Sequence, residues 1–154
     1  MAVNPIPDGY QRVTPYLIID GASDAITYYC DVFGFTQRGD AMRSPDGKVG
    51  HAELELDGAL LMLADEFPSE GAVGPKTVGG SSVTLHLYVK DVDAVHAKAL
   101  KAGATALREP EDQFYGDRLS VIDDPWGHRW SIATHIEDVD PEEMGRRAAE
   151  AMSG

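Results

Sequence analysis

Two histidines and a glutamate are the side chains in this chain whose types and spacing best suit chemistry. His51 and Glu53 alternate along a strand-like run, so they share one face, while the apolar residues beside them share the other. His86 lies in a second run of the same kind. Two imidazoles and a carboxylate can bind a divalent metal with one position left open. Alternatively, Glu53 or His86 can act as a general base, or His51 and Glu53 are ordinary polar groups bonded to their neighbours.

The elements that must position these side chains occur twice. Residues 13–19 and 83–89 are apolar strand patterns, and each leads into an amphipathic helix that ends at a glycine, Gly34 or Gly103. Three more strand-like runs follow each helix. A segment rich in glycine and proline at 66–81 separates the two copies.

This repeat predicts an α+β fold made of two paired βαβββ modules. We expect one domain over residues 1–154, with module one at about 13–66, module two at about 82–135 and a helical tail at 140–152. In each module a helix covers one face of a four-stranded sheet. The other faces are expected to form a cleft that is left for a ligand.

The composition is strongly acidic. The 154 residues include 13 Lys and Arg against 26 Asp and Glu, which gives a net charge of −13. Nucleic acids and anionic membranes require a basic surface, so neither is expected as a partner. Such a charge instead attracts cationic ligands. A single cysteine, no apolar run long enough to span a membrane and no signal-peptide pattern predict a cytoplasmic protein.

Several other side chains are candidates for a small-molecule site. Tyr16 and Tyr88 have the strand parity of the ligand face, and each offers an apolar ring with a polar tip for a planar ligand, although packing in a core explains them as well. Tyr115 and Arg118 are expected at the mouth. Arg118 can bind an anionic group of a ligand or form a structural salt bridge.

Particular segments resemble the vicinal oxygen chelate superfamily, which includes glyoxalase I, fosfomycin-resistance proteins, extradiol dioxygenases and bleomycin-binding proteins, and above all its PhnB-like branch. The segments are Val13-Thr-Pro-Tyr-Leu17, Gly50-His-Ala-Glu-Leu54, Leu61-Met-Leu-Ala-Asp65, Asp124-Pro-Trp-Gly-His-Arg-Trp-Ser-Ile-Ala-Thr-His135 and Pro141-Glu-Glu-Met144. The resemblance implies paired βαβββ modules, usually in a homodimer.

Metal-using members of that superfamily carry one ligand on the first and the fourth strand of each module. Alignment places those positions at Thr14, Met62, Thr84 and Ser131, and none of these is a normal ligand for a divalent metal. We therefore expect no metal cofactor. The four residues are instead expected to line a ligand site.

The preferred function is metal-independent small-molecule binding, which resembles drug sequestration by the bleomycin-binding proteins. Two alternatives stay open. One is a lyase or isomerase that is related to glyoxalase and uses a non-standard metal site of His51, Glu53 and His86. The other is a non-catalytic partner subunit that docks through the C-terminal helix.

Overall fold

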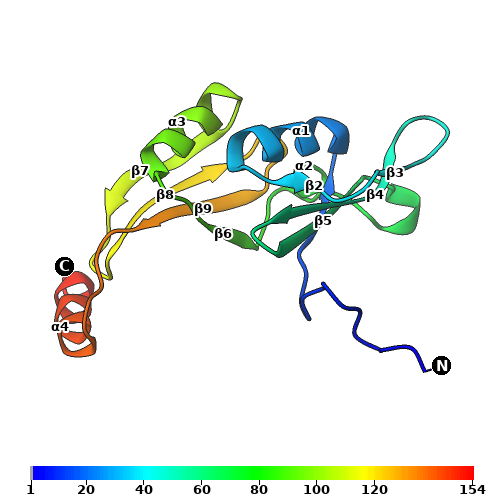
Figure 1. Cartoon of the computed structure of the whole chain (residues 1–154). Helices are drawn as coiled ribbons and strands as arrows, with labels where there is room; N and C mark the ends of the chain where they lie inside the picture. Colours follow the sequence, from blue (N-terminus) through cyan, green and yellow to red (C-terminus); the bar gives the residue numbers. More distant parts are fainter. Residues whose placement is uncertain (1) are drawn as a thin grey trace. The chain divides into compact units, whose positions relative to one another are not determined.

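The computed structural model describes residues 2–154, and the chain divides into two compact units. The first ends at Gly80 and the second begins at Ser81, within the segment that the sequence marks as a linker. Each unit contains one β-sheet and a helix on one of its faces (Figure 1). This is the mixed α+β architecture that the repeat predicts. Within residues 2–154 no helix is long and apolar enough to cross a membrane.

The first unit has a mixed sheet in the order β1-β5-β4-β2, with β3 also paired to β4. Strand β1 runs parallel to β5, and the other pairs are antiparallel. The elements are β1 (Tyr16–Ile19), α1 (Ala22–Phe33), β2 (Thr36–Gln37), β3 (Met42–Arg43), β4 (Val49–Leu56), β5 (Ala59–Asp65), the 3-10 turn Pro68–Glu70 and α2 (Pro75–Val78).

Helix α1 packs on one face of this sheet. Ile19, Leu54 and Leu63 on that face are fully buried, as is Tyr29 of the helix. Burial of each such side chain contributes about 1.5–3 kcal/mol. Because side chains alternate along a strand, His51 and Glu53 are held on the helix-free face, as the periodicity of β4 predicts.

The start of α1 differs from the sequence expectation. Ser23 and Asp20 have the residue types that cap a helix, so the sequence predicts one of them as the cap. The N-cap residue is instead Gly21, which has no side chain to do so. Asp65 at the end of β5 takes this role, since its Oδ1 accepts hydrogen bonds from the backbone N–H of Gly21 and of Ala22 (3.1 and 2.9 Å). Its Oδ2 accepts from the N–H of Val49 (2.7 Å). One carboxylate therefore ties the helix start to two strands.

The first strand-like run after α1, residues 35–42, predicts one strand, and here too the structure differs. It forms two short pieces: β2 pairs with the far end of β4, and β3 pairs with its beginning. Gly39, with φ of 68°, lies between them in the left-handed region. The chain turns there because glycine adopts this conformation without steric cost.

The second unit has a sheet in the order β6-β9-β8-β7, with β6 parallel to β9 and the other pairs antiparallel. Its elements are β6 (Thr84–Tyr88), α3 (Val92–Lys101), β7 (Thr105–Asp112), β8 (Asp117–Asp123), β9 (Arg129–His135) and α4 (Pro141–Met152). Helix α3 contacts β7, β8 and β9. Asp91 caps α3 as expected, accepting from the N–H of Ala94 (3.1 Å).

Strand β9 follows a turn that is built on Asp124. Its Oδ1 accepts from the backbone N–H of Trp126 and of His128, both at 3.0 Å. Its Oδ2 accepts from the indole N–H of Trp130 (3.0 Å). Trp130 is buried, as its strand parity, opposite to that of Ser131, predicts. The turn therefore fixes the start of the strand that carries Ser131.

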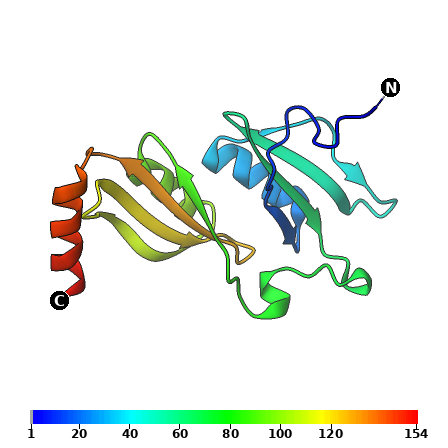
Figure 2. The ribbon, with the colours of Figure 1, turned by 90° about the horizontal axis from the view of Figure 1, so that it is seen from below.

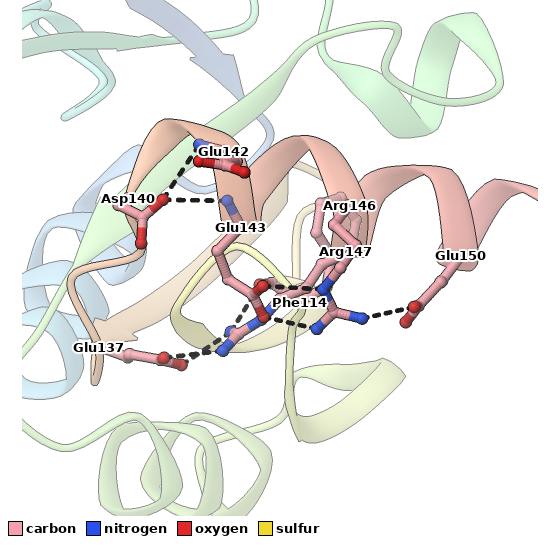
Figure 3. Close-up of polar contacts among 8 residues, drawn as sticks. All are labelled: Phe114, Glu137, Asp140, Glu142, Glu143, Arg146, Arg147 and Glu150. Atoms are coloured by element: carbon pink, nitrogen blue, oxygen red, sulfur yellow. Dashed lines mark hydrogen bonds and ion pairs between the residues drawn. The ribbon is translucent and has the colours of Figure 1, made fainter.

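The C-terminal helix α4 is attached to the second unit by ion pairs (Figure 3). Asp140 is of a residue type that caps helices, and it accepts from the N–H groups of Glu142 and Glu143. The Glu143 carboxylate does not return to the cap, because it binds the guanidinium groups of Arg146 and Arg147. Arg147 also donates to the Phe114 carbonyl oxygen (3.2 Å) and to the carboxylate of Glu137, which anchors the helix.

Candidate functional site

A chain of hydrogen bonds crosses the helix-free face of the first unit. His51 Nδ1 lies 2.9 Å from the Tyr16 hydroxyl, and His51 Nε2 lies 3.2 Å from Glu53 Oε1. Both contacts are satisfied by one neutral tautomer, in which Nε2–H donates to the carboxylate and Nδ1 accepts from the phenol. Phenol, imidazole and carboxylate therefore form one polar line on this face.

Tyr16 is the open end of this line. Its side chain is 46% exposed, and its ring lies tilted against the His51 ring with centroids 5.5 Å apart. Partial burial raises the pKa of its hydroxyl, so the phenol stays protonated and can donate. Met62 lies directly across from both Tyr16 and Glu53 in the strand register. The face thus offers an aromatic ring, a thioether and hydrogen-bonding groups together.

Glu53 is the closed end of the line, with its side chain only 14% exposed. The Tyr10 hydroxyl reaches both carboxylate oxygens, at 3.1 and 3.0 Å. The Arg38 guanidinium lies over the Tyr10 ring, 4.7 Å from its centroid, and 3.9 Å from Glu53 Oε2. Tyr10 and Arg38 were not identified from the sequence, because Tyr10 lies 43 residues from its partner and in a segment without periodicity.

The second unit carries a related set of groups. His86 Nδ1 lies 3.0 Å from the Ser131 hydroxyl, and the His86 ring meets the Tyr88 ring edge-on with centroids 4.8 Å apart. Tyr88 is 58% exposed and donates to Asp117 Oδ2 (2.7 Å), and this bond raises the pKa of its hydroxyl. An exposed tyrosine next to a histidine and a buried carboxylate therefore recurs here.

Asp117 connects this set to the tail. It accepts from His135 Nδ1 (2.8 Å), and His135 Nε2 lies 2.8 Å from Asp138. These bonds, first to Asp138 and then to Asp117, raise the pKa of His135 above its ordinary 6.5. Burial acts to raise the pKa of Asp117, but the hydrogen bonds from His135 and Tyr88 outweigh it, so the Asp117 pKa is lowered. Asp117 and His135 sit opposite each other in the register of β8 and β9.

We expect the stability of the second unit to fall as pH rises through the raised pKa of His135. Only the imidazolium can donate to both carboxylates, so its stabilisation is complete below the ordinary pKa and disappears above the folded one. Melting temperatures between about pH 5.5 and about pH 8.5 should show this decline in the wild type, and a His135→Gln variant should show a smaller one. Asp138→Asn should give an intermediate slope. Identical slopes in all three proteins would mean that His135 is not the responsible group.

Tyr115 and Arg118, the two candidates expected at the mouth of the site, make different kinds of contact: Tyr115 a ring contact and Arg118 salt bridges. The Tyr115 ring meets the Phe114 ring edge-on, with centroids 5.3 Å apart. Arg118 donates to both Asp93 oxygens (2.7 and 3.0 Å) and to Asp112 (2.9 Å). Asp93 belongs to α3, so the guanidinium is engaged on the helix side of the sheet as a salt bridge, the second of its two expected roles.

Comparison with known proteins identifies the family. The model of the Glyoxalase/Bleomycin resistance protein/Dioxygenase superfamily matches residues 11–132. The chain belongs to this superfamily. An uncharacterized protein of Mycobacterium bovis is 40% identical over 147 residues, which cover 94% of this chain and 93% of that protein.

Solved structures agree with this membership. TioX from Micromonospora sp. ML1 is 25% identical with a TM-score of 0.61, and the match covers 82% of this chain and 100% of TioX. A PhnB protein from Bacillus cereus is 19% identical with a TM-score of 0.65, over 80% of this chain and 99% of that one. The fold of the PhnB-like branch is therefore shared, as the sequence resemblance predicts.

The positions that align with the superfamily's metal ligands do not fit a metal. Thr14 lies just before β1, and Met62, Thr84 and Ser131 lie on strands. A thioether and three hydroxyl groups supply no anionic charge to offset dehydration of the ion. Over residues 2–154, no three His, Cys, Asp or Glu side chains are grouped so that they could hold an ion.

The alternative set of His51, Glu53 and His86 is divided between the units. His51 and Glu53 belong to the first unit and His86 to the second. Both ring nitrogens of His51 are already engaged, one by Tyr16 and the other by Glu53. A metal could bind His51 only by breaking one of these bonds. The geometry therefore favours hydrogen bonding over metal coordination for His51.

Proposed function

We propose that this superfamily member binds a small cationic or aromatic molecule on the helix-free face of its first unit, without a metal. The observation that carries the proposal is the Tyr16–His51–Glu53 line, which joins an exposed phenol to a mostly buried carboxylate. The aromatic ring offers stacking and cation–π contacts, and the carboxylate offers a charged acceptor. A net charge of −13 adds attraction at long range.

Drug sequestration, as the bleomycin-binding proteins of this superfamily perform it, suits this chemistry. Bleomycin is a cationic, partly planar ligand, and we propose it as the first compound to test. Because attraction by a diffuse charge is screened by salt, the affinity should fall between about 50 mM and about 500 mM salt. A dissociation constant that does not change with salt would remove the electrostatic part of the proposal.

Substitution of Glu53 should weaken this binding strongly. In calorimetric titrations with metal-free bleomycin, we expect Glu53→Gln to raise the dissociation constant by about tenfold, because a charged hydrogen-bond acceptor is lost. Glu55→Gln is the matched control, since it removes the same charge two residues along the same strand face. Equal effects of the two variants would show that only the net charge matters and that Glu53 forms no site.

The same line of groups favours a second candidate, proton transfer in a lyase or isomerase. An imidazole held between a phenol and a carboxylate can relay a proton, and Glu53 or His86 is the expected base. An assay of lactoylglutathione formation from methylglyoxal and glutathione tests this candidate. Turnover that is lost in His51→Ala would support it. The absence of turnover in the wild type would rule out this candidate and leave binding as the proposed function.

A further inference from the structure

The N-terminal arm, residues 4–12, contacts the first unit near its end, at Glu53 and at the Leu60 backbone. Figure 2 shows this arm in dark blue, leading into the first strand of the unit. Nearly all of its residues are exposed, and Tyr10 and Gln11 are partly buried exceptions. The arm is therefore held at few points.

Gln11 is one of these points. Its side-chain Nε2 donates to the Leu60 carbonyl oxygen, and its Oε1 accepts from the Leu60 N–H, both at 2.9 Å. The paired register of β1 and β5 begins only at Met62, so the Leu60 backbone is open on that edge. The amide of Gln11 satisfies both groups in the place of a neighbouring strand.

Tyr10 is the second residue that holds the arm, through hydrogen bonds to Glu53. Its hydroxyl lies within hydrogen-bond distance of both Glu53 carboxylate oxygens. His51 Nε2 also bonds to Oε1. The Arg38 guanidinium lies over the Tyr10 ring and donates to the Gly9 carbonyl oxygen (3.4 Å). A ligand group that approaches Glu53 therefore competes with Tyr10 for the carboxylate.

We propose that Tyr10 occupies a subsite for a phenol-type ring, so that the arm is a built-in competitor that the ligand displaces. This inference rests on the proposed binding function and specifies the ligand class of the same site. The groups around Tyr10 define that class: Glu53 accepts from the hydroxyl, and Arg38 stacks on the ring. The matching ligand is a flat aromatic ring with a hydroxyl group.

Displacement of the arm lowers the apparent affinity for the ligand, because only part of the molecules have an open site. The apparent dissociation constant equals the intrinsic one divided by the fraction of molecules whose site is open. Removal of the Tyr10 ring deletes the competitor and leaves the Gln11 clamp in place. We expect the apparent affinity for a phenol to rise by about tenfold in Tyr10→Ala.

The experiment titrates full-length wild type, Tyr10→Ala and Tyr10→Phe with tyramine, a small cationic phenol, and with phenethylamine, which lacks only the hydroxyl. We expect tyramine to bind Tyr10→Ala about tenfold more tightly than wild type and Tyr10→Phe to be intermediate. Phenethylamine should bind each protein more weakly than tyramine does. Ile6→Ala, which truncates an exposed side chain of the same arm, should match wild type.

The outcomes separate this inference from the function on which it rests. Tyramine affinities that agree within about twofold in wild type and Tyr10→Ala would overturn the competitor role. Equal affinities for tyramine and phenethylamine would overturn the phenol class. In either case the bleomycin titrations of Glu53→Gln and Glu55→Gln still decide the binding function independently. Far-ultraviolet circular dichroism of Tyr10→Ala confirms that the variant is folded.

Discussion

Replacing Asp124 by alanine should destabilise the second unit by about 3 kcal/mol or more. The Asp124 side chain is buried and accepts from two backbone N–H groups and from the Trp130 indole. Truncation removes the acceptor of one buried and two part-buried donors, and a lost acceptor costs about 1–3 kcal/mol for a buried donor. The turn that starts β9 would lose its organising group, and Ser131 would lose its fixed position on that strand.

Urea unfolding followed by tryptophan fluorescence measures this effect directly. The chain has two tryptophans, Trp126 and Trp130, and both belong to the second unit. The neighbouring Asp123→Ala variant is the matched control, since it removes the same charge but only from a partly exposed ion pair with Arg129. Such pairs contribute little. If Asp123→Ala and Asp124→Ala shifted the midpoint equally, the structural role assigned to Asp124 would be wrong.

Replacing Gly116 by alanine should also cost about 3 kcal/mol or more, and it should release α4. A Cβ atom at this position would lie 2.1 Å from the Glu137 carbonyl oxygen, and the φ of 97° is unfavourable for alanine. The Gly116 carbonyl oxygen also accepts from the N–H of Ile136 and of Glu137 (2.9 and 3.0 Å). A shift of Glu137 would break the bonds that hold Arg147.

Two measurements test this prediction. Fluorescence-monitored unfolding gives the stability loss, and the rate of trypsin cleavage at Arg146 and Arg147 reports whether α4 has detached. Gly103→Ala is the control in the same unit, because its φ is also positive but the nearest atom to a Cβ would be Pro125 Cγ at 3.4 Å. Gly103→Ala should lose only about 1–2 kcal/mol, without faster cleavage. Equal losses would show that backbone strain alone accounts for Gly116.

The fold could be predicted from the sequence because its signals are local. The alternation along β4 separates the His51 and Glu53 face from the Leu54 face, and the glycine after α1 adopts the left-handed conformation that ends the helix. Repetition of this pattern in the second half indicates two equivalent sheets. These features depend on neighbours within a few residues, so one sequence suffices to predict them.

The candidate site was only partly predictable, because some of its contacts join residues that lie far apart in the sequence. His51 and Glu53 share a face as expected, but the arm residue Tyr10, which binds Glu53, has no periodic signal. The cap of α1 was misassigned for the same reason, because Asp65 reaches the helix start from the end of β5. Asp117 and His135 could have been paired from the sequence, since the hairpin of β8 and β9 places them opposite each other.

The central claim is that the helix-free face of the first unit binds its ligand through side chains and not through a metal. The most direct test is a bleomycin titration of one preparation before and after treatment with EDTA and dialysis, together with its metal content. The account predicts substoichiometric metal and dissociation constants that agree within about twofold. Binding that is lost with EDTA, restored by zinc or manganese and absent in His51→Ala would contradict it.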